Sequence, residues 1–285
     1  MDNPAPGTLY LVATPIGNLG DISQRASQTL RDADFIAAED TRVTRKLLEH
    51  LSIKKPMVSY YEHNRAESGQ RIISRILSGE SCALVTDAGT PGISDPGEEL
   101  VRLCTDAGIR MLAIPGPCAA IAALTLSGLR TGRFTFEGFL STAKKSRFEH
   151  LEELKTEKRT MVFYEAPHKL MRTLADMLTV FGDRRISIAR EITKIYDETL
   201  RYKLSEAISH FEKTPPRGEF VLVIEGAQPA PYSGAVLEDA IDTARLHINE
   251  GLSLKDAVRI AATDYGVSRN ELYNAVVKTK PPQNR

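Results

Sequence analysis

The sequence predicts an α/β protein with two α/β/α domains followed by a small helical domain. Short runs rich in Val, Ile and Leu alternate with longer amphipathic segments, which is typical of parallel strands connected by helices. This alternation occurs in two successive series, and a Pro/Gly/Ser-rich segment at 227–234 separates them from a purely helical end. We therefore expect domains at residues 1–120, 121–228 and 235–285.

The first series contains five predicted strands, enough for one sheet. They cover residues 9–13, 35–38, 57–60, 83–86 and 111–114. A small-residue helix at 118–126 and a turn at 127–132 lead into the second series. That series has predicted strands at 134–139, 161–164, 186–189 and 220–225, with helical spacing at 148–155 and 168–181.

The composition is that of a globular protein and excludes several classes. The chain has 285 residues, with 37 basic residues balanced by 37 acidic ones, so no overall charge favours a nucleic acid or a membrane. No apolar run approaches the roughly 18 residues of a membrane span, and no signal peptide is recognisable, so we expect a cytoplasmic protein. The three cysteines lack CxxC spacing and are expected to be reduced core thiols, and the six histidines form no ligand pattern, so no metal site is predicted.

The loop after the fourth predicted strand is unusual. Residues 85–97 read VTDAGTPGISDPG, with three glycines, two prolines and two aspartates but no basic residue. Ligands of open parallel sheets bind at the carboxyl ends of the strands, and this loop matches neither the P-loop nor the GxGxxG phosphate-binding pattern. It suits a cationic or zwitterionic ligand that approaches the main chain closely, such as S-adenosylmethionine. The structural alternative is that Gly and Pro form tight turns while Asp87 and Asp95 cap helices.

Seven motifs in order resemble the tetrapyrrole methylase family of methyltransferases. They are TPIGNLGD (14–21), AEDTR (38–42), DAGTPGISDPG (87–97), IPGP (114–117), YEAPH (164–168), REITK (190–194) and GEF (218–220). The resemblance extends from Thr8 to Gly226, and the helical tail is also similar. Within the family, the chain resembles the branch that methylates the ribose 2'-hydroxyl of a decoding-region cytidine in 16S rRNA of the small ribosomal subunit.

This resemblance implies two α/β domains with S-adenosyl-L-methionine in the cleft between them, and a homodimer. The implied cofactor-binding residues are Ile16, Asp87, Ala88, Gly89, Cys118, Ala119, Ala166 and Pro167. The chain departs from the wider family in two places. It has PIGNLGD where GPGD is common, which speaks against a porphyrinoid substrate, and Cys118-Ala119 where many members have serines, which leaves contacts there to backbone groups.

A ribose hydroxyl is a very weak acid and therefore a poor nucleophile for methyl transfer. It has to be activated by a base, by a cation that stabilises the forming alkoxide, or by close placement at the methyl group. Polar residues after the strands are the candidates. We expect Asp40 or Glu191 to accept or orient the proton and Lys194 to contact the oxyanion or a phosphate. The candidates for RNA contact are Arg42, His63, Asn64, Arg65, His168 and Arg190. The alternative for residues 39–42 is a charged helix start, and for His168 a solvent-facing helix cap.

The helical end, 253–280, predicts a helix, a turn at 266–268 and a second helix capped by Ser268, as in a helix-turn-helix. Residues 251–285 carry six basic residues (Lys255, Arg259, Arg269, Lys278, Lys280 and Arg285) against three acidic ones. This part is expected either to contact RNA phosphates or to pack on the body or a second subunit. Two other functions stay open: methylation of a tetrapyrrole or other small molecule, and RNA binding without catalysis. The sequence leaves open which residue takes the proton, which nucleotide is modified, and whether naked rRNA or an assembled particle is the substrate.

Overall fold

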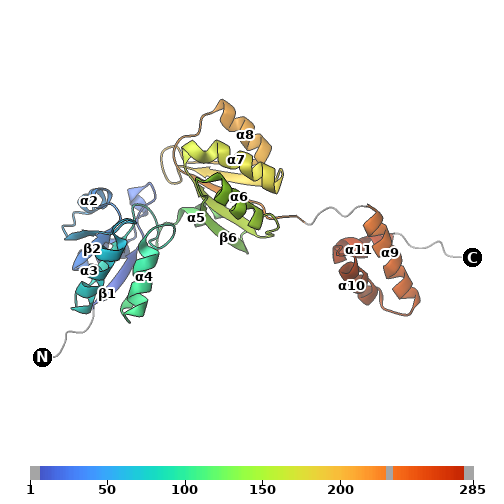
Figure 1. Ribbon diagram of the computed structural model, residues 1–285, viewed down its shortest axis with the longest axis horizontal. Coiled ribbons are helices and arrows are strands. Elements are labelled where there is room, and N and C mark those ends of the chain that lie inside the picture. Colours follow the sequence, from blue (N-terminus) through green and yellow to red (C-terminus); the bar gives the residue numbers. More distant parts are fainter. Residues whose placement is uncertain (1–6, 229–233, 279–285) are drawn as a thin grey trace, which may run out of the picture. The chain divides into compact units, whose positions relative to one another are not determined.

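The first five strands pair into one parallel sheet, as the sequence predicts. The computed structural model describes residues 7–228 and 234–278 (Figure 1). The strands are β1 (Thr8–Val12), β2 (Phe35–Ala38), β3 (Met57–Ser59), β4 (Cys82–Val85) and β5 (Arg110–Ile114). Their order is β3-β2-β4-β1-β5. The chain reverses its direction of progression across the sheet between β4 and β1, so the loops after these two strands are neighbours at the carboxyl end.

Four helices cover the two faces of this sheet. They are α1 (Gln24–Asp32), α2 (Thr41–His50), α3 (Arg65–Leu77) and α4 (Gly97–Asp106). Leu30 of α1 and Leu48 of α2 pack on one face, whereas Ile72 of α3 and Leu100 of α4 pack on the other. Ser23 caps α1 by accepting a hydrogen bond from the Ala26 N–H at 3.0 Å. The central strands β2 and β4 are buried along their whole length, which explains why they read as continuous apolar runs.

The second sheet is mixed, so the expectation of parallel strands is wrong here. Its strands are β6 (Phe134–Phe139), β7 (Thr160–Glu165), β8 (Arg185–Arg190), β9 (Glu198–Lys203) and β10 (Phe220–Ile224), in the order β6-β7-β10-β8-β9. Only β6 and β7 are parallel, because β10 inserts antiparallel between β7 and β8, and β9 folds back on β8 as a hairpin. Apolar runs show where strands are but not the direction in which they pair.

Two elements of this half differ from the predicted ones. Strand β9 was not predicted, because its sequence ETLRYK is mostly polar and it lies at the sheet edge, where only Leu200 and Tyr202 pack against the core. Helix α6 covers Lys144–Glu153, whereas the apolar spacing begins only at Phe148. Its first turns contain the buried Arg147, which a hydrophobic pattern does not detect.

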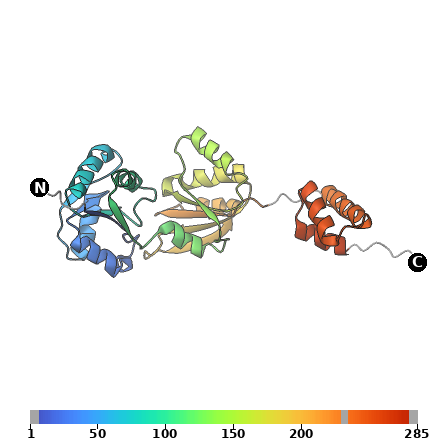
Figure 2. The ribbon, with the colours of Figure 1, turned by 90° about the horizontal axis from the view of Figure 1, so that it is seen from below.

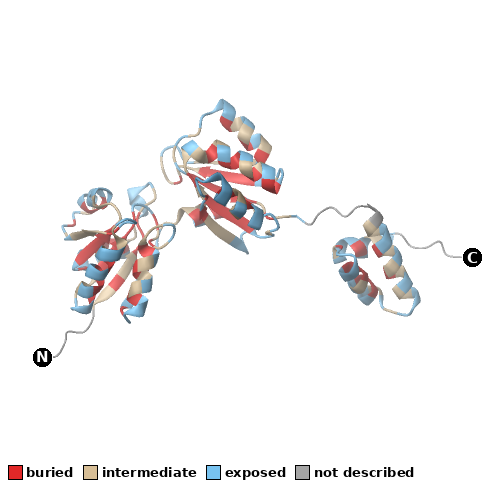
Figure 3. Ribbon diagram, viewed as in Figure 1, coloured by how far each residue is buried: buried red, intermediate tan, exposed pale blue. Residues whose placement is uncertain are grey.

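Helices cover both faces of the second sheet as well. Helix α5 (Ala119–Leu126) packs through Ala120, Ala123 and Leu124 against one face. The other face carries α6, α7 (Pro167–Phe181) and α8 (Leu204–Lys213). Figure 3 shows the resulting burial along the strands and on the inner sides of these helices.

The chain divides into two units, one up to Ala227 and one from Gln228. The second unit contains α9 (Gly234–Asn249), α10 (Leu254–Asp264) and α11 (Arg269–Lys278). These helices are coloured orange to red in Figures 1 and 2. Their shared core includes Ala244, Val258 and Leu272. The predicted helix, turn and helix are present, with Ser253 as the cap of α10. Most of the predicted linker (229–233) and the basic residues Lys280 and Arg285 lie outside the described residues. No helix in the described ranges is long and apolar enough to cross a membrane.

A buried ion pair anchors the segment that follows β6. Arg147 is 2% exposed and donates from Nε to the Asp176 carboxylate at 2.7 Å. Its Nη1 also donates to the backbone oxygens of Ser141 and Thr142, each at 3.0 Å. These contacts fix the turn that begins directly after Phe139, the last residue of β6.

We therefore expect Arg147→Met to lower the free energy of unfolding by about 3–5 kcal/mol, because it leaves Asp176 and two carbonyl oxygens without their partner. Urea denaturation followed by circular dichroism measures this change. The double variant Arg147→Met/Asp176→Leu should recover part of the loss, since it removes both charges. Equal stability of the single variant and the wild type would contradict the role given to this pair.

Candidate active site

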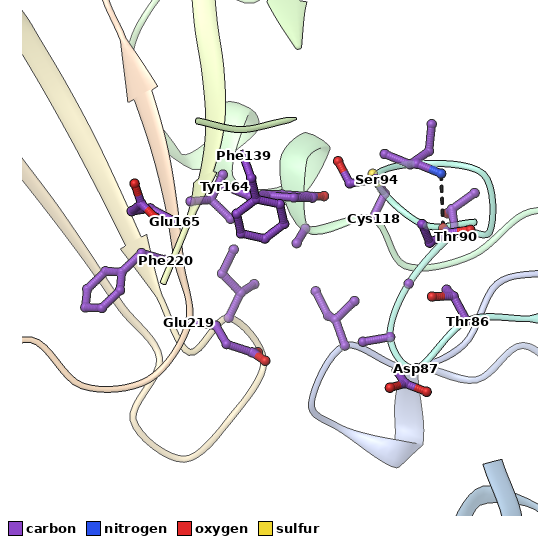
Figure 4. Close-up of a pocket in the computed structure, with 18 of the residues that line it drawn as sticks. Thr86, Asp87, Thr90, Ser94, Cys118, Phe139, Tyr164, Glu165, Glu219 and Phe220 are labelled. Atoms are coloured by element: carbon purple, nitrogen blue, oxygen red, sulfur yellow. Dashed lines mark hydrogen bonds between the residues drawn. The ribbon is translucent and has the colours of Figure 1, made fainter. Parts of the chain in front are cut away.

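A cavity of about 440 Å³ opens where the carboxyl ends of the first sheet face the second sheet (Figure 4). On one side it is lined by the loops after β1, β4 and β5. On the other side it is lined by the ends of β6 and β7, the start of α7 and the residues around the start of β10. All eight residues implied for cofactor binding line it: Ile16, Asp87, Ala88, Gly89, Cys118, Ala119, Ala166 and Pro167. Cys82 and Cys104 are buried in the core, whereas Cys118 is only half-buried in this wall.

Backbone hydrogen bonds hold the loops of the first side together. The Thr14 N–H donates to the Gly89 oxygen at 2.9 Å, and the Gly89 N–H donates back to the Thr14 oxygen at 3.1 Å. Gly89 has a φ of +88°, a conformation that favours glycine. The Thr90 hydroxyl donates to the Pro117 oxygen at 2.9 Å, which adds the loop after β5. The three loops therefore form one connected surface.

Asp95 organises the rest of the loop after β4. Its carboxylate accepts hydrogen bonds from the N–H groups of Gly92 at 2.9 Å, Ile93 at 3.2 Å and Gly97 at 2.7 Å. Because Gly97 is the first residue of α4, Asp95 stabilises the turn before this helix and caps its start, as the structural alternative for this loop predicted for Asp95. Burial nevertheless raises its pKa.

The lining of the cavity is acidic. It includes the carboxyl groups of Glu39, Asp87, Asp95, Glu165 and Glu219, and none of the described residues that line it is Lys, Arg or His. Glu39 accepts a hydrogen bond from the Thr86 hydroxyl at 2.6 Å, and Asp87 accepts one from the Asp40 N–H at 3.0 Å. Burial, and then the negative charge of Glu39, raise the pKa of the Asp87 carboxyl. Such a cavity favours a ligand that carries positive charge.

Aromatic side chains form part of the opposite wall, and sequence reasoning did not select them. Tyr164 lies with its ring centroid 5.5 Å from that of Phe139, which is 52% exposed (Figure 4). The Tyr164 hydroxyl accepts a hydrogen bond from the Ala120 N–H at 3.2 Å, which ties β7 to the start of α5. Burial raises the pKa of Tyr164 to about 12, so it stays a neutral phenol at physiological pH. The available signal was the position of both residues at the ends of strands β6 and β7.

Glu165 lies in the same wall but is internally satisfied. Its carboxylate accepts from the Ala166 N–H at 2.8 Å and from the Thr173 hydroxyl at 2.5 Å, and the residue is 2% exposed. It therefore anchors the start of α7. Besides Phe139 and Tyr164, the lining residues that were not singled out as site candidates from the sequence are Thr86, Thr90, Ile93, Ser94, Ile192, Glu219, Phe220 and Val221.

Glu191 and Lys194, both expected to act in catalysis, meet at the rim of the cavity. The Lys194 ammonium donates to Glu191 and to Glu219, each at 2.9 Å, and Glu219 lines the cavity. Burial tends to raise the pKa of Glu191, but hydrogen bonds from Lys194 and the Glu219 N–H lower it overall. Burial likewise tends to lower the pKa of Lys194, yet the two carboxylates raise it overall. Both groups are thus charged at neutral pH.

Asp40, the third expected catalytic residue, does not line the cavity. Its carboxylate caps α2 through the Arg42 N–H at 2.8 Å and pairs with the Arg42 guanidinium, where the shortest contact is 2.6 Å. The Arg42 side chain thereby lowers the pKa of Asp40 to about 2. A carboxylate of this pKa is a weak base. Residues 40–42 thus form a charged helix start, which was the alternative to a catalytic role.

The remaining residues considered for RNA contact also lie outside the cavity lining. His63 and His168 are exposed. Asn64 closes its own turn by accepting from the Tyr61 N–H at 2.8 Å. Arg65 pairs with Glu99 at 3.1 Å, and Arg190 pairs with Glu198 at 3.2 Å. Among these residues, the two exposed histidines and Arg42, whose side chain is 85% exposed, are the most accessible.

Two family models match the chain. Tetrapyrrole (Corrin/Porphyrin) Methylases matches residues 8–208, and the RsmI C-terminal HTH domain matches residues 235–280. The chain belongs to the tetrapyrrole methylase family.

Relatives place the chain more closely within the family. It is 48% identical over 268 residues to ribosomal RNA small subunit methyltransferase I of Synechocystis sp., covering 94% of this chain and 96% of that protein. It is 45% identical to the protein of the same name from Bacillus subtilis, covering 94% of each. These relatives include the C-terminal helical part, so this tetrapyrrole methylase belongs to the ribosomal RNA small subunit methyltransferase I branch.

Solved structures agree with the fold of this tetrapyrrole methylase. Uroporphyrin-III C-methyl transferase from Thermus thermophilus, complexed with S-adenyl homocysteine, matches with a TM-score of 0.56 at 16% identity, over 77% of this chain and 97% of that chain. Cobalt precorrin-4 methyltransferase matches with a TM-score of 0.57 at 15% identity, over 76% and 94%. At these identities the similarity concerns the fold.

The raised pKa of Asp87 has a consequence for stability. A carboxyl whose pKa is higher in the folded than in the unfolded state reduces stability as pH rises through its titration. We therefore expect Asp87→Asn to raise the melting temperature of the ligand-free protein at pH 7, since Asn keeps an oxygen for the Asp40 N–H. Differential scanning fluorimetry measures the change.

Asp95→Asn is the matched control and should change stability in the opposite direction. Its pKa is also raised, but both oxygens accept backbone hydrogen bonds, and an amide NH₂ cannot replace one of them. A lower melting temperature for Asp87→Asn would contradict the view that this carboxylate is uncompensated in the ligand-free protein.

Proposed function

We propose that this chain is an S-adenosylmethionine-dependent methyltransferase that methylates the ribose 2'-hydroxyl of a decoding-region cytidine in 16S rRNA. The observation that carries the proposal is the acidic cavity, which holds several carboxylates and no basic side chain among its described lining residues. The names of the relatives support a small-subunit ribosomal RNA as the acceptor.

The cavity fits the proposed donor in size and in charge. A volume of about 440 Å³ lies within the range of roughly 300–1,000 Å³ that small-molecule sites occupy. S-adenosylmethionine carries a sulfonium and an ammonium, and Asp87 and Glu39 supply negative charge for such groups. Gly89 keeps the loop thin, because its φ of +88° is a conformation that residues with a Cβ rarely adopt. Asp87, Ala88, Gly89, Cys118 and Ala119 are proposed to hold the donor from one side, and Ala166 and Pro167 from the other.

When bound, the donor supplies a methyl group that is already activated for displacement. The residues of the chain must then orient the acceptor hydroxyl and stabilise the charge that its oxygen develops. Lys194 is proposed to stabilise the developing charge on the acceptor oxygen. It lies at the rim, where its ammonium can exchange its bond to the exposed Glu219 for a bond to that oxygen. Glu191 is proposed to orient Lys194 or to take the proton. Asp40 lies outside the cavity lining, so the role proposed for it is to orient the Arg42 side chain rather than to take the proton.

RNA contacts are proposed for the basic and polar residues around the rim and for the helical unit. His63 and His168 are exposed, and Arg42 is exposed although it pairs with Asp40. Asn64, Arg65 and Arg190 also have partners within the protein and would have to exchange them. On α10 and α11, Lys255, Arg259, Arg269 and Lys278 are exposed, which suits phosphate contacts. The small ribosomal subunit is the proposed partner, and a ribosomal substrate implies a cytoplasmic enzyme.

A homodimer is also proposed, because every residue of α5 except Thr125 is apolar. Ile121 and Leu126 remain 45% and 43% exposed, and Leu112 on the edge strand β5 is 39% exposed. A helix that is hydrophobic all round is normally buried, so a second copy is the proposed cover. Sedimentation velocity tests this. Ile121→Asp should shift a dimer toward monomer, and a wild type that sediments as a monomer at micromolar concentration would refute the proposal.

Incubation with methyl-labelled S-adenosylmethionine tests the function. The acceptors are small ribosomal subunits that lack the modification, deproteinised 16S rRNA and a porphyrinoid. Label in rRNA that survives alkaline hydrolysis as a 2'-O-methylated cytidine dinucleotide supports the proposal. Label in the porphyrinoid supports small-molecule methylation, and RNA binding without label supports a non-catalytic binding protein.

We expect Lys194→Met to lower kcat for rRNA methylation by about 10²–10³-fold, the loss typical of one group that stabilises a developing oxyanion. The affinity for S-adenosylmethionine, measured by isothermal titration calorimetry, should stay close to that of the wild type. Lys203→Met, which removes an exposed lysine of β9, is the matched control and should retain activity. A kcat for Lys194→Met equal to that of the control would exclude Lys194 from the reaction.

A further inference from the structure

The segment 191–197 between β8 and β9 presents two neighbouring apolar side chains to solvent. Ile195 is 95% exposed and Tyr196 is 74% exposed, and no other large hydrophobic residue in the described ranges is as exposed as either. We call this pair the rim tip. Adjacent exposed apolar side chains, unlike scattered single ones, are typical of interaction sites.

Hydrogen bonds and an unusual backbone conformation flank the rim tip within the segment. Glu191 and Thr193 have φ values of 51° and 67°, which non-glycine residues, and β-branched ones above all, adopt rarely. Backbone strain of this kind persists only where surrounding contacts enforce it, and it is concentrated at functional sites. Here the Thr193 N–H donates to the Asp197 carboxylate at 2.8 Å, and the Asp197 N–H donates to the Lys194 oxygen at 3.1 Å.

The same segment belongs to the rim of the cavity. Ile192 lines the cavity directly, and Lys194 is bonded to the cavity-lining Glu219. The Asn18 N–H donates to the Thr193 hydroxyl at 3.2 Å, so the loop after β1 supports the segment from the other side. The rim tip therefore lies on the same short segment as a cavity-lining residue, within reach of a nucleotide whose ribose enters the cavity at this rim.

The charges of the segment are already compensated within the protein. Arg190 pairs with Glu198 at 3.2 Å, Lys194 is bonded to Glu191 and Glu219, and Asp197 accepts from the segment's own backbone. The rim tip therefore suits a base rather than a phosphate. A second protein copy needs about 800 Å² per partner, more than two side chains offer, and the larger apolar set on α5 is better suited to that contact.

We propose that the rim tip holds an unstacked RNA base next to the acceptor nucleotide. The Tyr196 ring provides a face for stacking, and Ile195 fills the space that the displaced base leaves in the strand. Proteins that recognise single-stranded RNA stack its unstacked bases on aromatic rings in this way. This inference rests on the proposed function. It assigns to Ile195 and Tyr196 the selection of RNA in which the base next to the acceptor nucleotide is unstacked.

Four variants test the inference: Tyr196→Ala, Tyr196→Phe, Ile195→Ala and, as a matched control, Leu77→Ala, which removes another exposed apolar side chain on α3. The probes are a short single-stranded RNA carrying 2-aminopurine beside a cytidine, and unmodified small ribosomal subunits. The measurements are quenching of the 2-aminopurine fluorescence, the KM for subunits, and the calorimetric affinity for S-adenosylmethionine.

We expect Tyr196→Ala to weaken RNA binding or raise the KM by about 5- to 150-fold, the range for loss of one base–aromatic stack. Tyr196→Phe keeps the ring and should restore wild-type values, Ile195→Ala should give a smaller loss, and Leu77→Ala none. The affinity for the donor should not change in any of them. Quenching should be present with the wild type and absent with Tyr196→Ala.

Unchanged RNA binding and KM in Tyr196→Ala would overturn the inference, as would a wild type that binds neither probe. A shift from dimer to monomer in Tyr196→Ala would assign the rim tip to a protein contact instead, which also overturns it. If the wild type binds RNA through Tyr196 but transfers no methyl group, the proposed function fails and the inference stands. If the wild type methylates subunits and Tyr196→Ala does so equally well, the proposed function stands and the inference about the rim tip fails.

Discussion

The Asp87 carboxylate, placed beside Glu39 in an acidic cavity without a basic neighbour among the described lining residues, is the constraint on which the proposed chemistry depends. Its raised pKa shows that the folded protein does not fully compensate its charge. Groups with such perturbed pKa values cluster at functional sites. The surrounding architecture keeps Asp87 in place: the bridge between Thr14 and Gly89 and the three hydrogen bonds to Asp95 fix the loop that carries it.

The two sheets contribute differently to the site. The parallel first sheet supplies thin loops and carboxylates, while the mixed second sheet supplies Tyr164, Phe139 and the strained segment with Lys194. Contacts between the loop after β1 and this segment, such as the Asn18 N–H to the Thr193 hydroxyl, connect the two sides at the rim. Gly17 lies in the same contact, where an added Cβ would come within 2.5 Å of the Lys194 side chain. Donor binding and acceptor binding are thus carried by adjoining but separate parts of the chain.

The sequence was sufficient for the parts of the fold that hydrophobic patterns describe. Nine of the ten strands fall in short apolar runs that the sequence shows, and the glycine-rich loop with Asp87 was recognisable by its composition. The antiparallel insertion of β10 was not predictable, because pairing direction depends on contacts between distant segments. Strand β9 and the first turns of α6 were missed because an edge strand and a buried, ion-paired Arg147 do not have an apolar pattern.

The same distinction applies to the site. The loops after β1, β4 and β5 each follow directly on a predicted strand, so their place at the carboxyl end of the sheet could be predicted. The residues selected in these loops line the cavity. Phe139 and Tyr164 are brought to it by the second sheet, and a pattern along the chain does not show that. Asp40 and Arg65 follow strands of the first sheet and carry suitable groups, but their partners, Arg42 and Glu99, occupy them. Whether a charged side chain is free or paired is a property of the folded structure.

The most direct measurement is the affinity for S-adenosylmethionine as a function of pH, by isothermal titration calorimetry, for the wild type and Asp87→Asn. Ionised Asp87 favours the cationic donor, so wild-type affinity should fall as pH decreases through the raised pKa of this group. The variant should bind about 10- to 150-fold more weakly at pH 7, the range for one lost hydrogen bond to a charged group, and with less dependence on pH. Equal affinity and an equal pH profile for both proteins would contradict the assignment of this cavity to a cationic methyl donor.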